Sequence, residues 1–271
     1  MKKIFAFLYV IGLLFINFYL CVGSDVFAAH ILEPLGTEIA ATPPRGRIFG
    51  QVRYEFSREE NGALKDIHLL PVELEIGIGE RTQLNLEGGI LLREKETGYP
   101  KDSGVEEIGF GIKHRFLDET RILPDAAFGA EFSPSTGVNG NGHGMKGTVI
   151  FSKNLHPGFV IHFNGAYELE TEREFDGATG TEEVVNHTIW SYSVAPMIKV
   201  IPDRLMVLAE LNGQSPAFGD TELTLAPEVI GVIQTETFFT LQNLAFKLAV
   251  PFGLNEHSPD IGVKFGISKL F

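Results

Sequence analysis

The chain has 271 residues, of which 44% are apolar, and its 22 Lys and Arg stand against 35 Asp and Glu, a formal net charge of −13. This apolar and aromatic content argues against intrinsic disorder, and the acidic balance gives no reason to expect a nucleic-acid partner. A single cysteine excludes a disulfide framework and a thiolate metal cage.

The first 28 residues have the pattern of an export signal. Lys2 and Lys3 precede an apolar run over residues 4–22, and residues 26–28 offer the small side chains that a signal peptidase needs, so we expect cleavage after Ala28. The alternative is an uncleaved anchor, because the apolar run has nearly the length of a membrane helix. Cleavage would leave a net charge of −14 and no cysteine.

An arm at residues 29–47, which we expect in the periplasm, follows the signal. After this arm, apolar and polar side chains alternate along the rest of the chain. In the first segment Ile48, Val52 and Tyr54 fall on one face, and Gln51 and Arg53 fall on the other. This period of two predicts strands, since a helix would scatter the apolar set around its axis. The twelve predicted strands are 48–57, 65–78, 82–93, 104–116, 123–133, 146–153, 159–171, 187–199, 205–212, 222–233, 239–252 and 260–271.

The breaks between these strands alternate in length. The short breaks are 79–81, 117–122, 154–158, 200–204 and 234–238, and the longer ones are 58–64, 94–103, 134–145, 172–186, 213–221 and 253–259. Short turns on one side and long loops on the other are typical of outer-membrane barrels. Residues 48–271 therefore predict an all-β, closed antiparallel up-and-down transmembrane β-barrel of about 12 strands, surrounded by outer-membrane lipid. A soluble lipocalin-type barrel would usually have eight strands and an apolar interior.

The polar face of the strands is expected to line the lumen, because a charge at mid-depth in hydrocarbon costs about 2–4 kcal/mol. The charged residues predicted to line it are Arg53, Glu55, Glu73, Glu75, Glu87, Glu107, Lys113, Arg115, Asp125, Glu131, Glu168, Glu210, Glu228, Lys247 and Lys264. Acids outnumber bases in this set, which favours cations and disfavours acidic sugars or phosphate. A compatible alternative is that most of these charges pair in a structural network.

The last residue of the chain predicts an assembly signal. Phe271 is preceded by apolar side chains at alternate positions, and only Lys269 breaks the alternation. This resembles the C-terminal signal that the barrel assembly machinery reads, so we expect that machinery and periplasmic chaperones as partners during biogenesis.

The sequence predicts no enzyme, cofactor or metal. No His pair has the spacing of metal ligands, and the Gly-rich residues 140–144 lack the Lys-Ser/Thr step of a phosphate loop, which indicates an outer loop instead. Barrel phospholipases place a Ser–His pair on the lipid-facing surface. His114 faces lipid by its parity, but no serine is predicted beside it.

Short motifs in a fixed order carry a resemblance to a known family. They are Leu70-Pro71-Val72-Glu73, Gly77-Ile78-Gly79-Glu80-Arg81-Thr82, Glu107-Ile108-Gly109-Phe110-Gly111-Ile112-Lys113-His114-Arg115-Phe116, Phe132-Ser133-Pro134-Ser135-Thr136-Gly137, Pro202-Asp203-Arg204-Leu205, Ala209-Glu210-Leu211, Leu225-Ala226-Pro227, Gly253-Leu254-Asn255 and Pro259-Asp260-Ile261-Gly262-Val263. Their order resembles that in the outer-membrane transporters associated with the meta-pathway of phenol degradation. The resemblance implies a passive, porin-like route for small compounds, aromatic or hydrophobic ones among them.

Two functions stay open at this level. The first is a channel or transporter for passive entry of small solutes, favoured by the inward glycines Gly89, Gly109, Gly111 and Gly129, which leave room in the lumen. The second is a structural or surface-adhesion barrel with a sealed lumen, which acts through its extracellular loops, above all residues 135–144.

Overall fold

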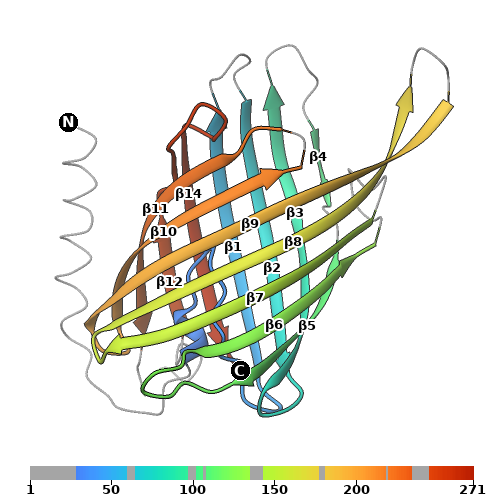
Figure 1. Ribbon diagram of the computed structural model, residues 1–271. Helices are drawn as coiled ribbons and strands as arrows, with labels where there is room; N and C mark the ends of the chain where they lie inside the picture. Colours follow the sequence, from blue (N-terminus) through green and yellow to red (C-terminus); the bar gives the residue numbers. More distant parts are fainter. Residues whose placement is uncertain are drawn as a thin grey trace, which may run out of the picture.

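The computed structural model describes residues 29–59, 65–96, 102–105, 108–134, 143–176, 181–217, 219–233 and 244–271. Twelve strands close into one antiparallel barrel, which confirms the predicted fold class (Figure 1). The predicted signal peptide and most of the Gly-rich loop lie outside the described residues. In the part that the structure describes, no helix is long and apolar enough to cross a membrane.

Each barrel strand pairs with its neighbours in chain order. The strands are β1 (Ile48–Glu59), β2 (Lys65–Gly77), β3 (Thr82–Glu96), β5 (Gly109–Leu117), β6 (Asp125–Ser133), β7 (His143–His156), β8 (Phe159–Asp176), β9 (Thr181–Ile201), β10 (Leu205–Pro216), β11 (Glu222–Ile233), β12 (Leu244–Ala249) and β14 (Ile261–Leu270). Pairing of β1 with β14, with Phe49 opposite Leu270, closes the barrel. Two short strands, β4 (Asp102–Val105) and β13 (Phe252–Gly253), add to β3 and β11.

The predicted break at residues 172–186 is too long. The structure continues β8 to Asp176 and starts β9 at Thr181, so that this hairpin projects beyond the other strands (Figure 1). We attribute the error to the projecting part, where neither face of the hairpin has to meet lipid. Without that requirement the apolar alternation disappears from the sequence, while the backbone can still pair.

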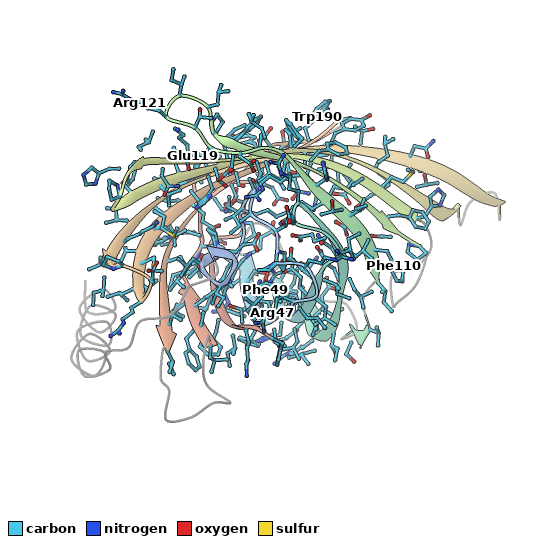
Figure 2. The ribbon with its side chains drawn as sticks, turned by 90° about the horizontal axis from the view of Figure 1, so that it is seen from below. Arg47, Phe49, Phe110, Glu119, Arg121 and Trp190 are labelled. Carbon is cyan, nitrogen blue, oxygen red and sulfur yellow. The ribbon has the colours of Figure 1, made fainter. Side chains whose placement is uncertain are left out.

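The outer face of the barrel is apolar. Phe110 and Trp190 are each more than half exposed on it, whereas Phe49 is fully buried inside (Figure 2). A closed barrel leaves no unpaired strand edge, and an exposed apolar belt of this kind is stable only in lipid. The chain is therefore an outer-membrane barrel, with its short turns on the periplasmic side.

Replacing Val194 by arginine tests this orientation. Val194 pairs with Phe163 on one side and with Leu211, near the middle of β10, on the other. We expect the free energy of unfolding to fall by about 2–4 kcal/mol, measured by urea titration in phospholipid vesicles. Ile122 is 85% exposed in the turn between β5 and β6. Arginine in its place should lower the free energy of unfolding by only about 0–1 kcal/mol. Equal effects at the two positions would contradict a lipid-facing Val194.

The core of the protein lies inside the short-turn end of the barrel. The arm begins there with a 3-10 turn, η1 (Ala29–Leu32), and places Ile31 and Leu32 against inward-facing side chains. These inward partners are Val160, Ala195, Met197, Met206, Leu208, Ile230, Val232 and Ala245. Seen from this end, the arm runs within the ring of strands (Figure 2). The predicted periplasmic arm thus packs in the lumen, because its apolar side chains are buried there.

The C-terminal residue closes the end of β14. The backbone N–H of Phe271 donates to the carbonyl oxygen of Ile48 over 2.8 Å. Lys269, which interrupts the apolar alternation, places its ammonium nitrogen 4.9 Å from the centroid of the Phe271 ring. A cation–π contact of this kind accommodates the charge beside the terminal aromatic ring. The role of Phe271 in assembly stays a prediction.

Candidate functional site in the lumen

One wall of the lumen is a network of ion pairs on β1, β2 and β14. Arg53 Nε lies 3.2 Å from Glu55 Oε1, and Arg53 Nη1 lies 3.6 Å from Glu73 Oε2. Lys264 Nζ lies 3.4 Å from the other oxygen of Glu55. Glu55 and Lys264 are direct cross-strand partners, so the strand register itself brings these charges together.

A second group of charges lies deeper, around Lys113. Its ammonium is fully buried and lies 3.5 Å from Glu75 Oε1 and 3.7 Å from Glu38 Oε2. It also donates to the carbonyl oxygen of Ile39 over 3.3 Å. Glu38 and Ile39 belong to the arm, so this buried lysine joins the arm to β2 and β5.

Two predicted lumen carboxylates hold the backbone of the arm. The N–H of Leu35 donates to Glu228 Oε2 over 3.0 Å, and the N–H of Gly36 donates to Glu210 Oε1 over 3.1 Å. Farther along, the N–H of Ala40 donates to Ser152 Oγ over 3.0 Å. The arm is therefore a bound plug, fastened to β10, β11 and β7.

The remaining predicted charges are spread around the barrel. Glu131 pairs with Lys146 over 3.6 Å, and Lys247 donates to Gln51. Arg115 pairs with Asp118 over 3.4 Å at the short-turn rim. Glu87 lines the cavity described below, whereas Glu107 lies outside the described residues.

The space beside two of the inward glycines, Gly109 and Gly111, is taken up by their neighbours. A Cβ atom at Gly109 would meet the carboxylate of Glu131, and one at Gly111 would meet the side chain of Asn85. These glycines therefore accommodate neighbouring polar side chains. The open space lies elsewhere in the lumen.

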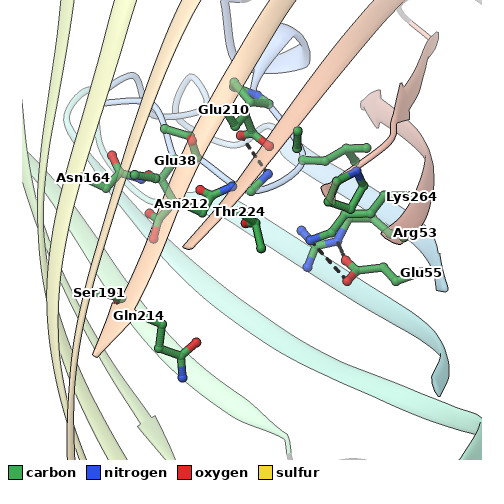
Figure 3. Close-up of a pocket in the computed structure, with 18 of the residues that line it drawn as sticks. Glu38, Arg53, Glu55, Asn164, Ser191, Glu210, Asn212, Gln214, Thr224 and Lys264 are labelled. Atoms are coloured by element: carbon green, nitrogen blue, oxygen red, sulfur yellow. Dashed lines mark hydrogen bonds and ion pairs between the residues drawn. The ribbon is translucent and has the colours of Figure 1, made fainter. Parts of the chain in front are cut away.

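The open space is a cavity of about 550 Å³ above the arm. Its base is made by residues 33–38, and it reaches Ser57, Gln214 and Glu222 near the long-loop end. Figure 3 shows Arg53, Glu55 and Lys264 on one side of it. Uncharged polar side chains from β8 to β11 face it on the other side, namely Asn164, Ser191, Ser193, Asn212, Gln214 and Thr224.

The lumen residues predicted from the sequence include neither this uncharged wall nor Lys146. The prediction covers only charged side chains of the inward face. The same parity that places Glu168 and Glu210 inward also places Asn164, Asn212 and Thr224 there. The signal was therefore present in the alternation, although nothing in it singled out neutral residues.

Two further polar features lie outside the lumen. In the turn between β5 and β6, burial opposes ionisation of Glu119, but hydrogen bonds from Asn154 and Lys153 outweigh it and hold the pKa of Glu119 below its ordinary value. On the outer face, His114 Nδ1 lies 2.9 Å from Thr82 Oγ1. Among the residues that the structure describes, no group of three His, Cys, Asp or Glu could hold a metal ion.

Comparisons with known proteins match the fold of this chain but not its sequence. No family model and no curated protein matches the sequence. Among solved structures, an outer-membrane channel of Pseudomonas putida F1 superposes with a TM-score of 0.67 at 12% identity, covering 86% of this chain and 98% of that one. The translocator domain of the autotransporter NalP of Neisseria meningitidis gives 0.52 at 11% identity, covering 83% and 88%. The NanC porin gives 0.50 at 10% identity, covering 83% and 98%. At these identities the likeness shows the outer-membrane barrel fold alone.

Proposed function

We propose that this barrel is an outer-membrane channel for the passive entry of small solutes. The observation that carries the proposal is the polar cavity that extends from the arm to the long-loop end of the lumen. The names of two structural neighbours, a channel and a porin, support the same function. The motif resemblance to the phenol-pathway transporters adds aromatic or hydrophobic compounds as candidate solutes.

The charge of the cavity supports a preference for cations. Seven of its lining residues are glutamates, and three are lysine or arginine. A lumen with surplus negative charge raises the local concentration of cations and repels anions. Glu73 belongs to this lining, whereas Glu80 is exposed in the turn between β2 and β3.

We expect the purified barrel in planar bilayers to carry a cation-selective current, measured as the reversal potential across a salt gradient. Glu73→Gln should reduce the cation-to-anion permeability ratio about twofold, because it removes one lumen charge. Glu80→Gln removes the same charge outside the lumen and should leave the ratio unchanged. Anion selectivity in the wild-type protein would contradict the proposed charge of the path.

One observation favours the second candidate, a structural or surface-adhesion barrel with a sealed lumen. The arm is fastened inside the short-turn end by Glu210, Glu228 and Lys113. A sealed barrel would carry no current and would not speed solute entry into liposomes. In a sealed barrel, deleting residues 135–144 would abolish surface binding and leave permeability unchanged. A channel would carry current and admit solutes both with and without these residues.

A further inference from the structure

We propose that the lumen cavity is a binding site for a neutral, polyhydroxylated solute of sugar size, recognised by the uncharged polar side chains of β8 to β11. This inference rests on the proposed channel function and names the class of solute that the path takes.

A continuous row of neutral polar side chains crosses four adjacent strands. Asn164 on β8 pairs with Ser193 on β9, Ser193 pairs with Asn212 on β10, and Asn212 pairs with Thr224 on β11. Direct cross-strand neighbours have Cβ atoms about 4.5–5.5 Å apart. Neighbouring hydroxyls of a sugar can therefore meet neighbouring members of this row. Figure 3 shows Asn164, Asn212 and Thr224 around the cavity.

Three of the four members of the row have hydrogen-bonding capacity that the protein does not use. Asn164 is the exception, because its side-chain amide exchanges hydrogen bonds with the backbone N–H and carbonyl of Glu38 in the arm. Ser193 is only 5% exposed, and its hydroxyl has no hydrogen-bond partner. Within the described ranges, Asn212 and Thr224 have no side-chain hydrogen bond either. Ser193 is buried, so its unpartnered hydroxyl is costly and a ligand that supplies a partner is favoured. Asn212 and Thr224 are half-buried and remain open to hydrogen bonds from a solute in the cavity.

A second pair of neutral polar side chains without hydrogen-bond partners lies one step nearer the long-loop end. Ser191 on β9 pairs with Gln214 on β10, and both line the cavity. Neither side chain has a hydrogen-bond partner in the portion of the chain with described coordinates. The cavity therefore offers two successive cross-strand rows of hydrogen-bond donors and acceptors.

The opposite wall decides against anionic solutes. Arg53 and Lys264 are already paired with Glu55 and Glu73. An anionic solute would face a surplus of glutamates and would have to compete for these bases. The paired groups can still share hydrogen bonds with neutral hydroxyls, because carboxylates and guanidinium groups have several bonding positions.

The hydrogen-bonding row also decides against a purely hydrophobic solute, which would cover the row and leave its groups unsatisfied. A sugar donates and accepts at each hydroxyl, and its C–H face can rest on apolar surface. Ile67 and Leu69 on β2 supply such surface in the same cavity. The volume of about 550 Å³ lies within the range of small-molecule sites.

The test compares three probes on the full-length purified barrel: glucose, gluconate as its anionic counterpart, and benzyl alcohol as a small aromatic. Calorimetry in detergent measures binding, and liposome swelling measures entry of the two sugars. We expect glucose to bind most tightly. The triple variant Ser193→Ala, Asn212→Leu, Thr224→Val should weaken glucose binding about tenfold, because it removes three hydrogen-bonding groups and keeps the branching of Asn212 and Thr224.

Ser268→Ala is the matched control. Ser268 is an inward, buried serine whose hydroxyl also has no hydrogen-bond partner, but it does not line the cavity. We expect its glucose affinity to equal that of the wild type, and a heat-shifted band on a gel verifies that each variant is folded. Tighter binding of gluconate or benzyl alcohol than of glucose, or unchanged glucose binding in the folded triple variant, overturns the inference. Glucose binding without ionic current or swelling overturns the channel function and leaves the site intact.

Discussion

Removing residues 31–40 is expected to raise the single-channel conductance about tenfold, because these residues fill the short-turn end of a lumen whose twelve strands enclose more space than their own side chains need. The deleted segment contains Ile31 and Leu32 of the inner core, and Leu35, Gly36 and Ala40, which donate to the barrel wall. Planar-bilayer recording of the deletion variant beside the full-length protein measures the change. A conductance equal to that of the full-length barrel would mean that the path does not pass the arm.

A pair of glycine substitutions loosens the same arm without deleting it. A Cβ atom at Gly77 would collide with the carbonyl oxygens of Pro43 and Pro44, which are backbone atoms of the arm and cannot rotate away. Gly77→Ala should therefore displace the arm and increase the frequency of large-conductance openings. At Gly79, two residues farther on, an added Cβ atom would make only ordinary contacts with Thr82. Gly79→Ala is thus the matched control, and identical current traces for the two variants would contradict this account.

Replacing Lys113 by methionine is expected to lower the free energy of unfolding by about 3–5 kcal/mol, since it leaves the buried carboxylate of Glu75 without its compensating charge. Lys113 is fully buried and lies within 3.5 Å of Glu75 and 3.7 Å of Glu38. Urea titration in phospholipid vesicles measures the change. Because Glu38 belongs to the arm, the same variant should also show more frequent openings in bilayers.

Two variants control for the loss of a positive charge as such. Lys65 pairs with Glu94 over 2.8 Å, but both side chains are about one-third exposed, so Lys65→Met should cost only about 0–1 kcal/mol. Adding Glu75→Gln to Lys113→Met removes the stranded buried charge and should recover most of the lost stability. A Lys113→Met variant as stable as Lys65→Met would show that the buried network contributes nothing.

Most of the fold could be predicted because strand alternation is a local property. Ile48, Val52 and Tyr54 point outward for a reason that lies within their own segment, namely that lipid surrounds one face and the lumen lies behind the other. The twelve strands and their antiparallel order follow from this alternation and from the lengths of the breaks. At residues 172–186 the sequence predicts a break where the structure has the long hairpin of β8 and β9, since lipid imposes no apolar pattern outside the membrane.

The candidate site could be predicted only as a face of the sheet. Parity identifies Glu210 and Glu228 as inward residues, but no local pattern tells that they bind the backbone of Leu35 and Gly36, more than 170 positions away in the chain. The row from Asn164 to Thr224 likewise depends on the register of four strands, and register is set by turns and packing over the whole sheet.

The sequence by itself determined the barrel, its strand number, the face that meets lipid and the acidic character of the lumen, because each depends on side-chain parity and composition along single strands. Only the tertiary structure decided where the arm lies, which charges pair, and where space remains above the arm. These depend on closure of the ring, which brings β1 against β14 and sets residues from distant strands at hydrogen-bonding distance across a shared lumen.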